Sequence, residues 1–153
     1  MLGLAVVGLV YAIASVVHGR EPILVLVLAG VVVGSLAHDH VMAVAAVASS
    51  HDAVSLGIDV EPAKPLPDDA VALVMTSGDE PGTASRHLVG RILFAAKEAI
   101  YKAAHPLDGI ILNHDDILVS LAASCGRTRT GRVVRLYWFT SPRIVVLAIP
   151  SGR

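Results

Sequence analysis

Apolar residues dominate the first third of the chain and predict its first elements. The uncharged run 1–17, rich in alanine, leucine and valine, predicts a helix that ends near Gly19. Runs rich in β-branched residues then predict short strands at 23–28 and 31–36. The apolar run 41–49 is too short for periodicity to separate helix from strand. We favour a strand there, because another strand pattern follows directly.

The rest of the chain alternates strand, turn and helix signals. A strand predicted over 54–61 ends at the proline-rich piece 62–67, because proline cannot donate to a ladder. Asp68 and Asp69 then suit the start of a helix. The later elements follow in order: a helix over 70–75, a loop over 76–85, a long helix over 86–104 that ends before Pro106, and strands over 117–122, 133–139 and 144–149. This order predicts an α+β fold with antiparallel pairing.

The apolar front of the chain raises the alternative of a membrane segment. Its two uncharged runs, 1–17 and 23–37, are each shorter than the roughly 20 residues of a spanning helix. No lysine or arginine precedes Arg20, so the basic start of a signal peptide is missing. We therefore favour buried elements and a cytoplasmic location, and an apolar membrane hairpin over 1–37 stays as the alternative.

Composition narrows the classes of function. The 153 residues suit one compact domain, 54% of them are hydrophobic and only 16% are charged. The net charge is -1, which gives no broad basic surface for a nucleic acid. Cys125 is the single cysteine, so an internal disulfide and a cysteine-based zinc cluster are excluded.

Two acids interrupt the apolar pattern in the segment GIDVEP. On a strand, Asp59 and Glu61 project from the same face, with Cβ atoms roughly 6 to 7 Å apart. Ile58 and Val60 then point to the opposite face, into a core. Paired carboxylates repel each other, and a hard divalent cation between them removes this cost. An exposed polar strand face is the alternative interpretation of the same pattern.

The long predicted helix carries a second polar group in FAAKEAIYKA. Glu98 and Lys102 are four residues apart and lie on one helix face, where they could form an ordinary surface ion pair. Lys97 points elsewhere on the helix, which suggests an electrostatic or structural role. Three later polar positions are interpreted as solvated loop residues: His105, His114 and the pair Asp115-Asp116.

Together, GIDVEP and FAAKEAIYKA resemble the paired signature of the 4'-phosphopantetheinyl transferases. Further blocks in the same order strengthen the resemblance: GSLAH at 34–38, SLGIDVEPAKPLPDD at 55–69 and KAAHPL at 102–107. The similarity is greatest to the enterobactin synthetase component D branch, which serves siderophore, nonribosomal peptide and polyketide synthases. It implies transfer of the phosphopantetheine arm of coenzyme A to a serine of an acyl or peptidyl carrier protein.

The resemblance also implies roles for individual residues. Asp59, Glu61 and Glu98 match the ligands of a magnesium ion, and Glu98 is the candidate base. Lys102 matches the residue that neutralises phosphate charge, His38 matches a histidine that contacts a nucleotide phosphate, and Glu80 matches an acid in the loop before the long helix.

The chain departs from the two-lobed family pattern at its front. The resemblance implies that residues 1–50 correspond to a remnant of a mostly missing first lobe, and that 51–153 form the catalytic lobe. In that lobe an antiparallel sheet packs on a long helix. Arg20 is the sole basic residue of the first 50, although the family's first lobe supplies basic residues that grip coenzyme A. Two outcomes follow: a homo-oligomer with shared sites, or a catalytically silent module that binds only the carrier protein.

Overall fold

The structure, a computed structural model, describes the backbone of residues 32–38 and 43–151 and the side chains of 44–151. The helix predicted over 1–17 and the strand predicted over 23–28 lie outside these residues. The predicted strands over 31–36 and 41–49 correspond to β1 (Val32–His38) and β2 (Ala43–Ser49), which form a two-stranded antiparallel sheet.

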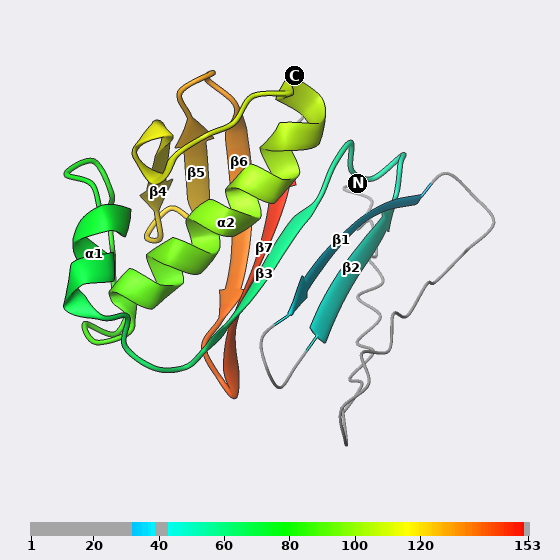
Figure 1. Cartoon of the computed structure of the whole chain (residues 1–153). Coiled ribbons are helices and arrows are strands. Elements are labelled where there is room, and N and C mark those ends of the chain that lie inside the picture. The colour runs from blue at the N-terminus through cyan, green and yellow to red at the C-terminus, as the bar shows by residue number, and fades with distance from the viewer. Residues whose placement is uncertain (1–31, 39–42, 152–153) are drawn as a thin grey trace.

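A five-stranded antiparallel sheet with one long helix across it forms the body of the fold (Figure 1). The strand order is β3-β7-β6-β5-β4, so β3 is one edge and β4 is the other. The strands are β3 (Gly57–Pro62), β4 (Ile117–Ser120), β5 (Cys125–Thr128), β6 (Val133–Phe139) and β7 (Arg143–Pro150). The helices are α1 (Asp68–Val74), α2 (Val89–Asp108) and the short 3-10 helix η1 (His114–Asp116). The predicted α+β class with an antiparallel sheet on a long helix is confirmed.

Helix α2 lies close to the sheet because small residues occupy much of its buried face. The alanines of that face are fully buried: Ala95, Ala96, Ala99, Ala103 and Ala104. The closest approach is at Gly57 on β3, where an added Cβ would lie 1.9 Å from the backbone oxygen of Ala99. Only glycine fits at this contact, and it brings the acids of β3 next to α2.

The two faces of the sheet bury separate apolar clusters. The face under α2 holds the larger cluster, which includes Ile92, Ile100 and Val146. The opposite face holds a second cluster with Ile58 and Val60, to which β2 contributes Val44 and Ala46. Ile58 and Val60 therefore point away from α2, as the alternation along GIDVEP predicts.

Several predicted boundaries were wrong. Strand β3 begins at Gly57 rather than at residue 54. Helix α2 begins at Val89, not at residue 86, and it continues through Pro106 to Asp108. Pro106 lies in the last turn, where it removes only its own amide donor, and the helix ends at Gly109 in the left-handed conformation. A further error is at the end of β4, which stops at Ser120 rather than at residue 122.

The strand β5 was absent from the predicted elements. Its sequence CGRT has no apolar alternation, and it follows the tight turn that contains Ser124 with a φ of 51°. Gly126 allows this strand to lie against α2, because an added Cβ would be 2.3 Å from Cδ1 of Ile100.

Among the described helices, none combines the length and the apolar character needed to cross a membrane.

Candidate active site

Strand β3 and helix α2 bring together the acids and bases singled out by the sequence. Asp59 and Glu61 alternate with Ile58 and Val60 and therefore face α2. On α2, Arg91, Glu98 and Lys102 are seven and four residues apart, so they fall along one stripe of the helix. Contacts between this stripe and β3 define the site.

Lys102 joins α2 to β3 through two hydrogen bonds. Its Nζ donates to Oδ1 of Asp59 at 2.7 Å and to the backbone oxygen of Ile58 at 3.1 Å. An ammonium has three donors, so these bonds use two of them. The side chain of Lys102 is 31% exposed, and this exposure leaves room for a further contact.

Asp59 is the most perturbed carboxylate. It is 7% exposed, and its Oδ2 is buried without a hydrogen-bond partner among the described residues. Burial raises the pKa of Asp59 from 3.8 to about 6; the contact with Lys102 lowers it, and the charges of Glu61 and Glu98 raise it further. Glu61 and Glu98 are therefore each close enough to Asp59 to disfavour its charged form. A buried, unpartnered oxygen in a negative field is a position that a cation would stabilise.

The other two acids each use one oxygen in a contact. Arg91 Nη1 donates to Oε2 of Glu61 at 2.9 Å, and His114 Nε2 lies 3.2 Å from Oε1 of Glu98. These contacts leave Glu61 Oε1 and Glu98 Oε2 without a hydrogen bond among the described residues. Glu98 and Lys102 do not pair with each other, because each contacts a different element.

The donor set fits magnesium, although it is not already gathered around one point. Within the described part of the chain, no three His, Cys, Asp or Glu side chains lie close enough together to hold a metal ion. The available atoms are carboxylate oxygens, which are the donors that magnesium prefers, and the Oδ2 of Asp59 has no partner. Side-chain movements of Glu61 and Glu98 would have to complete the site.

Lys97, next to Glu98 in the sequence, has a structural position. Its side chain is fully buried, and its Nζ contacts Oδ2 of Asp79 at 2.8 Å. It also donates to the backbone oxygens of Val74 and His114 at 2.8 and 2.9 Å. The sequence suggests an electrostatic or structural role, and these buried contacts favour the structural one.

The acid Glu80 lies at a different place in the fold. Its Oε2 accepts a hydrogen bond from Ser120 Oγ at 2.5 Å, and its backbone bonds to both neighbours of Ser120. Ser120 belongs to β4, which is the sheet edge opposite β3. The structure therefore does not bring Glu80 to the contacts around Asp59. His38 is the last residue of β1, and its side chain lies outside the described residues.

The interpretation of the late polar residues as solvated loop positions holds only in part. His105 is exposed, as predicted, but it is part of α2 rather than a loop, and its ring lies 5.3 Å from that of Tyr101. His114 is half-buried in η1 and contacts Glu98. Asp116 pairs with Arg129 at 3.3 Å. Asp115 is exposed, as predicted.

Sequence reasoning missed Arg91 and His114. Arg91 had a local signal, because it lies two helical turns before Glu98 on the same stripe. His114 had none, since its contact depends on how the chain returns after α2.

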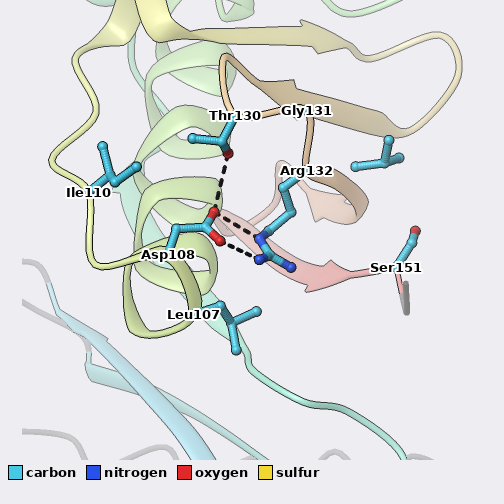
Figure 2. A pocket seen from close by; sticks show the side chains of 8 residues that line it. Leu107, Asp108, Ile110, Thr130, Gly131, Arg132 and Ser151 are labelled. Carbon is cyan, nitrogen blue, oxygen red and sulfur yellow. Dashed lines mark hydrogen bonds and ion pairs between the residues drawn. The ribbon is translucent and has the colours of Figure 1, made fainter.

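A pocket of about 510 Å³ lies at the C-terminal end of α2 (Figure 2). Across it, Arg132 and Asp108 form a two-point ion pair, and Thr130 Oγ1 donates to Asp108 at 3.3 Å. The hydrogen bond with Asp108 raises the pKa of Arg132 above its ordinary value. This pair joins the end of α2 to the turn between β5 and β6. None of the residues predicted for the active site lines this pocket.

Comparison with known proteins finds three relatives that are named 4'-phosphopantetheinyl transferases. The chain is 40% identical to the 4'-phosphopantetheinyl transferase Svp of Streptomyces mobaraensis over 109 residues, which cover 67% of this chain and 44% of that protein. It is 37% identical to the transferase Npt of Nocardia iowensis over 103 residues, 65% of this chain and 46% of that protein. It is 47% identical to the transferase PptT of Mycobacterium tuberculosis over 77 residues, 46% of this chain and 34% of that protein.

The chain thus spans less than half of the length of the curated relatives it matches. No family model matches it.

Proposed function

We propose that this chain is a magnesium-dependent 4'-phosphopantetheinyl transferase, acting on coenzyme A and on a serine of an acyl or peptidyl carrier protein. The observation that carries the proposal is the buried, unpartnered Oδ2 of Asp59, held beside Lys102 and in the field of Glu61 and Glu98. Similarity to three 4'-phosphopantetheinyl transferases supports it.

Each residue of the site has a part in the proposed reaction. Asp59, Glu61 and Glu98 would hold a magnesium ion, which when bound would neutralise charge on the pyrophosphate of coenzyme A. Lys102 keeps its contact with Asp59 and uses its remaining donor for a phosphate oxygen.

Glu98 takes the proton of the carrier serine, directly or through water. The serine oxygen forms a bond to the β-phosphorus as the bond to the 3',5'-ADP leaving group breaks.

Finer assignments follow from the sequence blocks rather than from the contacts. The blocks around GIDVEP and FAAKEAIYKA support the enterobactin synthetase component D branch, with a role in siderophore or other nonribosomal peptide and polyketide synthesis. Residues 51–153 are proposed as the catalytic lobe and 1–50 as the counterpart of a first lobe. His38 and Glu80 stay proposed contacts for coenzyme A. A cytoplasmic enzyme that forms homo-oligomers is the setting consistent with these assignments.

The decisive experiment measures transfer of a labelled pantetheine arm from coenzyme A to an apo carrier protein. We expect transfer that requires magnesium and that Asp59→Asn and Glu98→Gln abolish. Asp69→Asn is the matched control, because Asp69 is an exposed acid in the first turn of α1. Full transfer by Asp59→Asn would show that the site is assigned wrongly.

Binding measured without turnover separates the enzyme from a silent module. Coenzyme A titration with and without magnesium should show metal-dependent affinity if the site is intact. Carrier-protein binding without any affinity for coenzyme A would instead favour a module that only docks the carrier protein.

A further inference from the structure

The carboxylate of Glu98 is held by a residue from a distant part of the chain. His114 Nε2 lies 3.2 Å from Glu98 Oε1, and both side chains are partly shielded, at 29% and 34% exposure. A carboxylate oxygen accepts hydrogen bonds, so the imidazole donates through Nε2–H. This contact fixes one oxygen of Glu98 and leaves Oε2 for other partners.

The imidazole is itself held on a second side. Phe94, one turn before Glu98 on α2, packs against the His114 ring edge to face, with centroids 5.6 Å apart and an interplanar angle of 64°. The ring therefore lies against both Phe94 and the carboxylate, and both come from the same helix.

The backbone of His114 is anchored as well. Lys97 Nζ donates to the His114 carbonyl at 2.9 Å, and Lys97 is fully buried in its pair with Asp79. At either end of η1, the Asn113 amide donates to Asp116 Oδ2 at 2.9 Å and the Asp116 amide donates to the Asn113 carbonyl at 3.1 Å. The position of the imidazole is thus fixed by a buried ion pair and a capped turn.

We infer that His114 is a positioning residue for Glu98, which it orients so that Oε2 faces the metal and the substrate. The inference rests on the proposed function, since it assigns a purpose to the orientation of Glu98. His114 acts only through Glu98 and touches no reacting atom. Partners of this kind, which hydrogen-bond a metal ligand, change metal affinity or activity by roughly 10- to 100-fold when they are removed.

Two variants separate the hydrogen bond from packing. His114→Phe keeps a ring against Phe94 and loses the donor, whereas His114→Gln places an amide N–H near the position of Nε2. Magnesium affinity is measured without substrate, as the concentration that gives half of the metal-induced rise in melting temperature. We expect His114→Phe to need about 10-fold more magnesium and His114→Gln to stay within about threefold of the unchanged protein.

Kinetics provide a second measurement. With magnesium at saturating concentration for both proteins, His114→Phe should lower kcat about 10-fold with KM for coenzyme A unchanged, because the lost contact orients the base rather than binding the coenzyme. His105→Gln is the matched control, since His105 lies on the exposed end of α2 and contacts Tyr101 instead of an acid. A wild-type magnesium midpoint for His114→Phe would overturn the inference, as would equal damage in the Phe and Gln variants.

Failure of the proposed function is recognised separately. An unchanged protein without magnesium binding or transfer would refute the proposed function, whatever His114 does. The contact is then tested by a double-mutant cycle in metal-free protein with His114→Phe and Glu98→Met. A coupling between the two positions supports the orientation of Glu98 by His114, and additive effects overturn it.

Discussion

Helix α2 carries two lysine–carboxylate pairs that differ in how completely their polar atoms are satisfied. Lys97 and Asp79 are both fully buried, at a distance of 2.8 Å. Lys102 and Asp59 are slightly closer, at 2.7 Å, but the lysine is 31% exposed and one oxygen of Asp59 has no partner among the described residues. The two lysines belong to the same sequence block, so spacing alone does not separate their roles.

The pair formed by Lys97 and Asp79, called the inner pair below, is saturated with hydrogen bonds. Asp79 accepts bonds from the backbone and hydroxyl of Thr76 and from the backbone of Val119, in addition to the Lys97 contact. Lys97 reaches α1 through Val74 and η1 through His114. All of these contacts join parts of the fold, and none leaves a donor or acceptor for a ligand. Such a pair is expected to maintain structure.

The pair formed by Lys102 and Asp59, called the outer pair below, has unused hydrogen-bonding capacity. Burial raises the pKa of Asp59 to about 6, which means that the folded protein holds this carboxylate at a cost when it is ionised. A site that binds a cation and a phosphate needs such unused capacity, because saturated groups have no contacts left to offer. The difference between the pairs therefore separates a structural lysine from one suited to binding.

The largest expected effect comes from breaking the inner pair. Lys97→Met leaves Asp79 buried without its cation and should lower the free energy of unfolding by about 3 to 5 kcal/mol. Urea denaturation measures the loss, and Lys64→Met is the control because Lys64 is exposed. A loss below about 1 kcal/mol, the level of a surface pair, would contradict the structural role.

Breaking the outer pair should have the opposite effect on stability. Asp59→Asn removes a carboxylate with a raised pKa, so we expect a gain of up to about 3 kcal/mol at pH 8. Transfer activity should be lost in the same variant.

The dependence of stability on pH has a defined sign. The folded pKa of Asp59 is about 6 and the ordinary value is 3.8, so the folded state binds more protons between these values. The contribution of Asp59 to stability is therefore present below about pH 4 and is lost as the pH rises to about 6. Denaturation of Asp59→Asn across this range should lack that loss. A variant with the same pH slope as the unchanged protein would show that Asp59 is not the group responsible.

The sequence predicts the faces of the site better than its contacts. Alternation in GIDVEP puts Asp59 and Glu61 on one face of β3, and the burial of Ile58 and Val60 in the second cluster confirms this. The contact partners are not local, however: Lys102 is 43 residues from Asp59 and Arg91 is 30 from Glu61.

Prediction of the fold from the sequence is limited in the same way, because elements without a local apolar pattern were missed. Strands with a clear apolar pattern, alternating in β6 and continuous in β7, were predicted within a residue or two of their observed ends. The short β5 had no such pattern, because Gly126 is required there for close packing against Ile100. Partners that depend on tertiary packing, such as His114 for Glu98, leave no periodic signal in the sequence.

The smallest expected effect concerns Arg91, which contacts Glu61 in the candidate active site. Arg91 Nη1 donates to Oε2 of Glu61 at 2.9 Å, with both side chains 18% exposed. Its Nη2 donates to the backbone oxygen of Pro65 at 3.1 Å. Arg91→Met should therefore lower the free energy of unfolding by only about 1 kcal/mol.

The same change should strengthen magnesium binding, because a positive charge beside a ligand opposes a second cation. We expect the magnesium midpoint of Arg91→Met to fall roughly two- to threefold, whereas Arg91→Lys keeps the charge and should stay near the unchanged protein. The midpoint is read from the metal-induced rise in melting temperature at low and at high salt, and the effect should shrink as salt screens the charge. A higher midpoint for Arg91→Met would mean that Arg91 orients Glu61 as His114 is inferred to orient Glu98. The two contacts would then act alike, and the distinction between a competing cation and a positioning hydrogen-bond donor would be lost.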